Sequence, residues 1–161
     1  RLITPVQDKW ILTEPSTYTI YRNEPNGGLQ PFITRTPSVR TMEPEIFLFP
    51  GVITPRYYFL QTVKKECDFE KNQDMPKTDL VFDRQENKIY QYTVYNRDFN
   101  KRTEDMSARC INGETAFYVT LEANELVEAY EKDKLNGPLK AIAAKLNEED
   151  NPVIMIVKPK K

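Results

Sequence analysis

The chain has 161 residues, of which 39% are hydrophobic and 29% are charged, and this composition fits one globular domain with its own core. Its 23 Lys and Arg residues nearly balance its 24 Asp and Glu residues, so no net positive field draws in nucleic acid or an anionic membrane surface. No stretch approaches the roughly 18 apolar residues that a membrane-spanning helix needs, which predicts that this sequence has no transmembrane segment.

Short strand patterns dominate the first 120 residues. Runs rich in Tyr, Phe, Ile and Val alternate with turn-forming residues, as in antiparallel strands joined by hairpins. Tight turns are predicted at Pro25-Asn26-Gly27-Gly28 and at Asn112-Gly113, because Asn and Gly accept a positive φ, and a five-residue hairpin loop is predicted at 83–87. The predicted strands are residues 10–12, 18–21, 31–34, 45–49, 57–61, 80–82, 88–94, 106–111 and 115–121.

The pattern changes after residue 122. Apolar residues recur at helical spacing over 123–132 and again over 138–147, with the breaker Gly137-Pro138 between them, so two short amphipathic helices are predicted. The apolar run at 153–157 is too short for a helix and is rich in β-branched residues. It is predicted to be a buried strand that completes the last sheet.

Two segments repeat one another. "LITPVQDKWIL" at 2–12 is echoed by "VITPRYYFL" at 52–60, and each is followed by strands that end in Ile-Tyr. A weaker third unit extends over 106–121. Repeats of roughly 40–50 residues with several strands each are typical of β-propeller blades, although a match of three residues is also compatible with coincidence.

Three segments resemble the C-terminal half of the six-bladed β-propeller lipoproteins of Bacteroides-type gut bacteria. They are "PSTYTIYRNEPNGGLQPFITRTPSV" at 15–39, "RYYFL…LVFDRQENKIYQYTVYNRDF" within 56–99, and "LNEEDNPVIMIVKPK" at 146–160. The chain departs from the family at Tyr18, where the family often has Asp before Thr-Ile-Tyr. The resemblance implies propeller architecture and a cell-surface or periplasmic location, with a lipid anchor in the full-length protein; the family has no settled activity.

The predicted fold is therefore mostly β, with about three antiparallel β-propeller blades, two short C-terminal helices and a final closing strand. The approximate blades in a single partial domain, 1–161, are 2–50, 52–100 and 101–161. A closed propeller usually has four to eight blades. The chain is thus expected to be a fragment that completes its ring with a missing N-terminal half or with a second copy.

The sequence contains no histidine, which excludes a Ser–His–Asp triad, a Cys–His pair and His-containing zinc sites within this chain. Cys67 and Cys110 could form one disulfide or remain thiols. The candidate metal site is "DFEKNQD", which alternates the oxygen ligands of Asp68, Glu70, Asn72 and Asp74 in a pattern that calcium can use. The alternative for this segment is a solvated charged loop, because the Gly and distal Glu of the helix-loop-helix calcium motif are missing. No other cofactor is predicted.

Two carboxylate pairs could serve the acid and base roles of glycoside hydrolysis: Glu43 with Glu45, expected on one strand face, and Asp79 with Asp83. Such pairs also arise by chance in a chain so rich in acids. Aromatic residues at 57–59 and at 90, 92 and 95 could stack on a sugar or peptide, or pack between neighbouring sheets.

The functional prediction is a non-enzymatic cell-surface or periplasmic propeller module that binds a glycan, peptide or protein partner through its loops. Two alternatives stay open. One is a glycan-active hydrolase or lyase whose catalytic groups lie mainly in a missing N-terminal half. The other is a structural subunit of an outer-membrane uptake complex.

Overall fold

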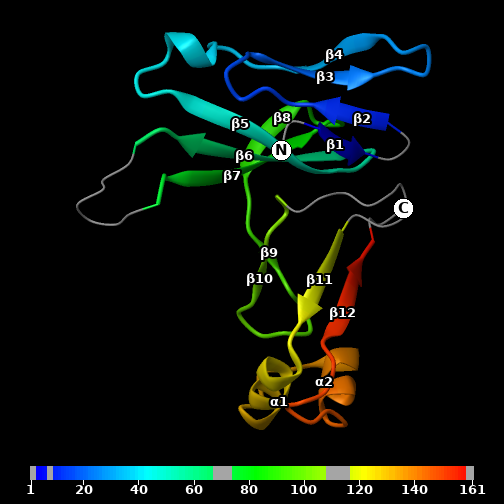
Figure 1. Cartoon of the computed structure of the whole chain (residues 1–161). Coiled ribbons are helices and arrows are strands. Elements are labelled where there is room, and N and C mark those ends of the chain that lie inside the picture. Colours follow the sequence, from blue (N-terminus) through cyan, green and yellow to red (C-terminus); the bar gives the residue numbers. More distant parts are fainter. Residues whose placement is uncertain (1–2, 7–8, 67–73, 108–116, 159–161) are drawn as a thin grey trace.

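The computed structural model describes residues 3–6, 9–66, 74–107 and 117–158 (Figure 1). Strands hold 44% and helices 14% of these residues, and the neighbouring strands run antiparallel, so the prediction of a mostly β protein with two helices is confirmed. Figure 1 shows two four-stranded sheets one above the other, with shorter strands and the helices below them.

The first sheet is a meander in which each strand pairs with the next along the chain. The predicted turn at 25–28 joins its last two strands: Gly27 has a φ of +80°, and its N–H donates to the Glu24 carbonyl at 2.9 Å. The sheet consists of β1 (Ile3–Val6), β2 (Lys9–Leu12), β3 (Thr19–Asn23) and β4 (Leu29–Thr34).

The second sheet repeats this order after a single 3-10 turn, η1 (Val39–Thr41). Its hairpin at 83–87 is confirmed and depends on Asp83, whose Oδ1 accepts hydrogen bonds from the backbone N–H groups of Gln85 and Glu86. The sheet consists of β5 (Ile46–Ile53), β6 (Tyr57–Lys64), β7 (Lys77–Asp83) and β8 (Lys88–Gln91).

The remaining strands of the described ranges form two short pairs, and these ranges contain no third four-stranded sheet. β9 (Val94–Tyr95) pairs with β10 (Thr103–Glu104), and β11 (Phe117–Leu121) pairs with β12 (Val153–Val157) along its full length. We call the β11–β12 pair the C-terminal ribbon. The predicted strand at 106–111 is wrong at its first two residues, because Asp105 accepts a hydrogen bond from the Ser107 N–H in a turn. The rest of that strand and the turn at 112–113 lie outside the described residues.

Two helices connect the strands of the C-terminal ribbon, as predicted. α1 (Ala123–Glu131) places Ala123, Leu126 and Ala129 on its buried side, at the three-residue spacing of one helical face. α2 (Gly137–Ala143) begins with Pro138 in its first turn, where the missing N–H of proline costs nothing. No helix in the described part of the chain is long and apolar enough to cross a membrane.

Three apolar clusters connect the first sheet to the second sheet, the second sheet to the C-terminal part, and the helices to the C-terminal ribbon. Ile11 and Ile20 of the first sheet pack on Ile53 of the second. The second sheet then contacts the C-terminal part through a cluster centred on Val52, Met106 and Phe117. The third cluster joins both helices to the C-terminal ribbon and includes the buried residues Leu121, Leu126, Leu135 and Leu139.

Gly51 lies at a close backbone approach between the second sheet and the C-terminal part. The Val52 N–H donates to the Met106 carbonyl at 2.9 Å. A Cβ atom on Gly51 would lie 2.1 Å from that same carbonyl oxygen, far inside van der Waals contact. The two backbones can therefore meet only because residue 51 has no side chain.

The prediction that 153–157 is a buried strand is confirmed for the strand but not for its burial, because two of its five residues are exposed and three are partly buried. Val153, Met155 and Val157 face the cores, whereas Ile154 and Ile156 are 63% and 58% exposed. The physical reason is that the ribbon has only two strands, and the described residues cover one of its faces. The proposed blade boundaries stay a prediction, since the described strands form no closed ring.

Candidate ligand-binding pocket

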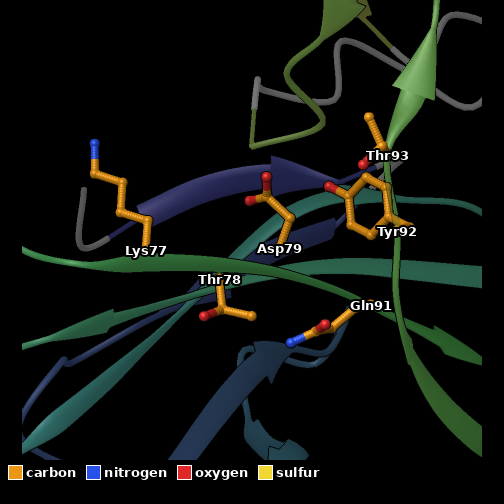
Figure 2. Close-up of a pocket in the computed structure, with 6 residues that line it drawn as sticks. All are labelled: Lys77, Thr78, Asp79, Gln91, Tyr92 and Thr93. Carbon is orange, nitrogen blue, oxygen red and sulfur yellow. The ribbon is translucent and has the colours of Figure 1, made fainter.

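A pocket of about 440 Å³ lies where β8 separates from β7 (Figure 2). All of its lining side chains are polar: Lys77, Thr78 and Asp79 come from β7, and Gln91, Tyr92 and Thr93 come from the end of β8 and the segment after it. The pocket is open to solvent and is the candidate functional site.

The pocket exists because β7 is longer than its neighbour. β8 pairs with β7 only from Leu80 to Asp83, whereas β6 pairs with β7 from Lys77 onward. After Gln91 the chain turns away toward β9, so residues 77–79 have β6 on one side and the pocket on the other. In Figure 2, Asp79 and Tyr92 extend to one side of the sheet, and Thr78 and Gln91 extend to the other.

Tyr92 is the aromatic group of the pocket. Its ring meets the ring of Phe59 edge-on, with centroids 5.1 Å apart and an interplanar angle of 73°, which fixes its position. Burial, followed by the negative charges of Asp79 and Asp105, raises the pKa of Tyr92 well above its usual range. The phenol is a hydroxyl group at physiological pH, as in any tyrosine, and can donate a hydrogen bond in the pocket.

Asp79 supplies the negative charge of the pocket. One of its oxygens, Oδ1, accepts a hydrogen bond from the Gln61 side-chain amide at 2.9 Å, which leaves its other oxygen for a ligand. Lys77, two residues earlier on the same exposed strand edge, supplies the positive charge. A carboxylate, an ammonium, a phenol, an amide and two threonine hydroxyls together can donate and accept hydrogen bonds in several directions.

Neither of the two predicted carboxylate pairs has the geometry that glycoside hydrolysis needs. Asp79 and Asp83 are four residues apart on one strand, a separation of about 13 Å, which exceeds the spacing of either glycosidase mechanism. Asp83 is also buried and bound to Arg56, with Nη2 and Oδ2 2.6 Å apart. Glu43 and Glu45 both precede β5 and do not share a strand face, and Glu45 pairs with Lys65 at 2.6 Å.

Most of the predicted calcium site lies outside the described part of the chain. Asp68, Glu70 and Asn72 lie outside the described residues, as do Cys67 and Cys110. Asp74 is described and exposed. Within the described ranges no group of three or more Cys, Asp or Glu side chains is positioned to hold a metal ion. The calcium site stays a prediction.

Some of the aromatic residues predicted as possible stacking groups pack against other rings, and others are exposed to solvent. Tyr58 contacts the rings of Phe32 and Phe82, and Phe59 contacts Tyr92, so packing between and along the sheets is confirmed for these positions. Tyr90 and Tyr95 are exposed.

Four pocket residues were not among the candidates that the sequence suggested: Lys77, Thr78, Gln91 and Thr93. The pocket exists because β8 is shorter than β7. The sequence did not indicate this difference in length, because it predicted a strand that continues to residue 94. Comparison of the chain with known protein families, with curated proteins and with solved structures finds no match, so the proposal below is argued from the fold and the pocket.

Proposed function

We propose that this chain is part of a non-enzymatic, propeller-type binding module whose pocket beside β7 and β8 binds a glycan. The observation that carries the proposal is the pocket where β8 leaves β7, which is lined by six polar side chains on the two sides of the sheet. Sugars present many hydroxyl groups that both donate and accept hydrogen bonds, and a tyrosine ring offers them an apolar edge as well.

The choice of binding over hydrolysis depends on the carboxylates. Glycoside hydrolysis by acid and base needs two carboxyl groups on either side of the bond that is cleaved. The residues that line the pocket include one carboxylate, Asp79, and its nearest predicted partner, Asp83, is engaged by Arg56. A single carboxylate can instead accept hydrogen bonds from the hydroxyl groups of a bound sugar.

The propeller arrangement is supported by the two four-stranded meanders that pack in series, with a third unit on the second. In the proposed arrangement each four-stranded sheet is one blade and the C-terminal strands belong to a third. A cell-surface or periplasmic location with a lipid anchor follows from the family resemblance and is part of the same proposal.

The test is a glycan-array screen followed by calorimetric titration of the best-bound glycan. Asp79→Ala and Gln91→Ala are expected to weaken binding by about tenfold each, since each removes hydrogen bonds to the sugar. Tyr92→Phe keeps the ring against Phe59 and removes only the hydroxyl, so a smaller loss is expected.

Matched controls lie away from the pocket. Glu131→Ala removes an exposed carboxylate at the end of α1, and Tyr130→Phe removes an exposed phenol hydroxyl on the same helix. Both should bind like the unmodified chain. Equal affinity of Asp79→Ala and the unmodified chain for every glycan bound would refute the proposed site.

A further inference from the structure

We infer that the pocket beside β7 and β8 selects glycans that carry a free amino group, and that Asp79 binds the ammonium. This inference rests on the proposed glycan binding and adds to it the class of sugar that is bound. An ammonium in the pocket gives Asp79 the cationic partner that the described part of the chain does not provide.

Asp79 and Tyr92 are neighbours on one side of the sheet. The paired part of β7 and β8 ends with Leu80 opposite Gln91. One step further, the same register brings Asp79 opposite Tyr92, and residues that lie opposite one another share a face of the sheet. Figure 2 shows the hydroxyl end of Tyr92 directed toward Asp79. A ligand on this side of the pocket therefore meets the carboxylate and the phenol together.

A second carboxylate adds to the negative charge on this side. Burial raises the pKa of Tyr92, and the charges of Asp79 and Asp105 raise it further. Asp105 is therefore close enough to act on the phenol, although it does not line the pocket. Two negative charges around one uncharged hydroxyl favour a ligand that brings a positive charge.

The hydrogen-bond partners of both carboxylates are uncharged. Asp79 accepts a hydrogen bond from the side-chain amide of Gln61 at 2.9 Å. Asp105 accepts hydrogen bonds from the N–H and the hydroxyl of Ser107, both at 2.8 Å. No lysine or arginine in the described ranges forms an ion pair with either carboxylate. Their negative charge is therefore not offset by a close cation and acts on a ligand in the pocket.

Lys77 is the one positive charge among the six residues that line the pocket, and it does not neutralise Asp79. The two residues are on the same strand, about 7 Å apart along it, and they form no ion pair. In Figure 2 the ammonium of Lys77 extends away from Asp79 and Tyr92. Lys77 repels a bound ammonium, so removing its charge should tighten the binding of an amino sugar.

Three trimeric oligosaccharides that share the same ring linkage test the inference by calorimetric titration. They are the trimers of glucosamine, N-acetylglucosamine and glucose, which carry an amino, an acetamido or a hydroxyl group at one matching position of each ring. The unmodified chain is expected to bind the glucosamine trimer at least about tenfold more tightly than the other two, because hydrogen bonds between charged groups are the stronger ones. Added NaCl should reduce this difference, since salt screens charges at an open site.

Two pocket variants with opposite expected effects identify the residues responsible. Asp79→Asn keeps the size of the side chain and removes its charge, so it should abolish the preference for the glucosamine trimer. Lys77→Gln should bind that trimer several-fold more tightly than the unmodified chain, because a like charge is removed. Glu131→Gln is the matched control, since it removes an exposed carboxylate at the end of α1, and it should bind like the unmodified chain.

Spermidine separates the charge from the sugar, because it carries ammonium groups without a ring. It is expected to bind at least about tenfold more weakly than the glucosamine trimer. Equal binding of spermidine would mean that the pocket recognises a polyamine, and the inference would be wrong.

The inference would also be overturned if the acetylated or the neutral trimer bound as tightly as the glucosamine trimer, or if Asp79→Asn kept the preference. Binding of neutral glycans that Asp79→Ala weakens would leave the proposed glycan site in place and exclude only the selection of amino sugars. Absence of binding to every glycan on the array would overturn both, so the two failures are told apart.

Discussion

At the scale of single residues, Gly51 and Asp83 fix the geometry of the second sheet. Gly51 lets the β5 backbone approach the Met106 carbonyl, and Asp83 closes the β7–β8 hairpin while it pairs with Arg56. One position therefore joins the sheet to the C-terminal part. The other determines where β8 begins.

Replacing Gly51 by Ala should destabilise the fold by about 1–3 kcal/mol, as is typical when an added methyl group must displace its surroundings. The added Cβ would meet backbone atoms, which cannot rotate away. Urea unfolding measures the change. Gly28→Ala is the control, because a Cβ there meets no backbone atom and contacts the Asn26 side chain, whose oxygen lies 3.2 Å away. Equal stability of the two variants would contradict the close approach at Gly51.

Asp83 should make the stability of the fold depend on pH in the acid range. The hydrogen bond from Arg56, assisted by the N–H groups of Glu86 and Gln85, lowers the pKa of Asp83 below its usual range. A lowered pKa stabilises the fold at neutral pH, and this contribution is lost as the pH falls below about 4 and the carboxylate is protonated.

Thermal melting of Asp83→Asn against pH checks this. The variant should melt at a lower temperature than the unmodified chain at pH 7, and the difference should shrink toward pH 2. A difference that is constant with pH would mean that the charge of Asp83 contributes nothing.

At the scale of elements, the helices attach to the molecule through one apolar face. Leu126 on α1 and Leu139 on α2 are buried in the cluster that reaches Leu121 on β11, whereas Ile142 on α2 is exposed. The helices thus fill the inner side of the C-terminal ribbon and leave its outer side open.

Leu126→Ala should destabilise the fold by about 2–5 kcal/mol, because it leaves a cavity where a leucine was fully buried. Ile142→Ala removes a similar amount of apolar side chain from an exposed position and should change stability much less. Urea unfolding of both variants tests whether α1 packs as described; similar losses would count against it.

The sequence predicted the elements that local chemistry determines and missed those that depend on distant partners. Gly27 and Asp83 create their turns within a few residues, so both hairpins were predictable. The end of β8 at Gln91 was not, because 88–94 has a continuous strand pattern and only tertiary structure bends it toward β9. For the same reason the sequence indicated Asp79 and Tyr92 as candidates but not the pocket that joins them.

Burial was predicted least well. The run at 153–157 is apolar on both faces, and a sequence pattern cannot say whether each face has a cover. The structure places Met155 against the helices and leaves Ile154 open.

At the scale of the whole molecule, the first sheet packs on the second, and the second packs on the C-terminal part and carries the pocket. The first sheet stabilises the second, and the second carries the pocket on the part of β7 that β8 leaves unpaired. A rigid sheet with a polar pocket at its edge is the arrangement on which the proposed glycan binding depends.

The most direct test of that central proposal is nuclear magnetic resonance mapping of the best-bound glycan from the array on the isotope-labelled chain. The amide signals of residues 77–79 and 91–93 should shift most, with saturation at a single set of positions. Shifts centred elsewhere, or no shifts at concentrations where binding is detected, would contradict the pocket as the binding site.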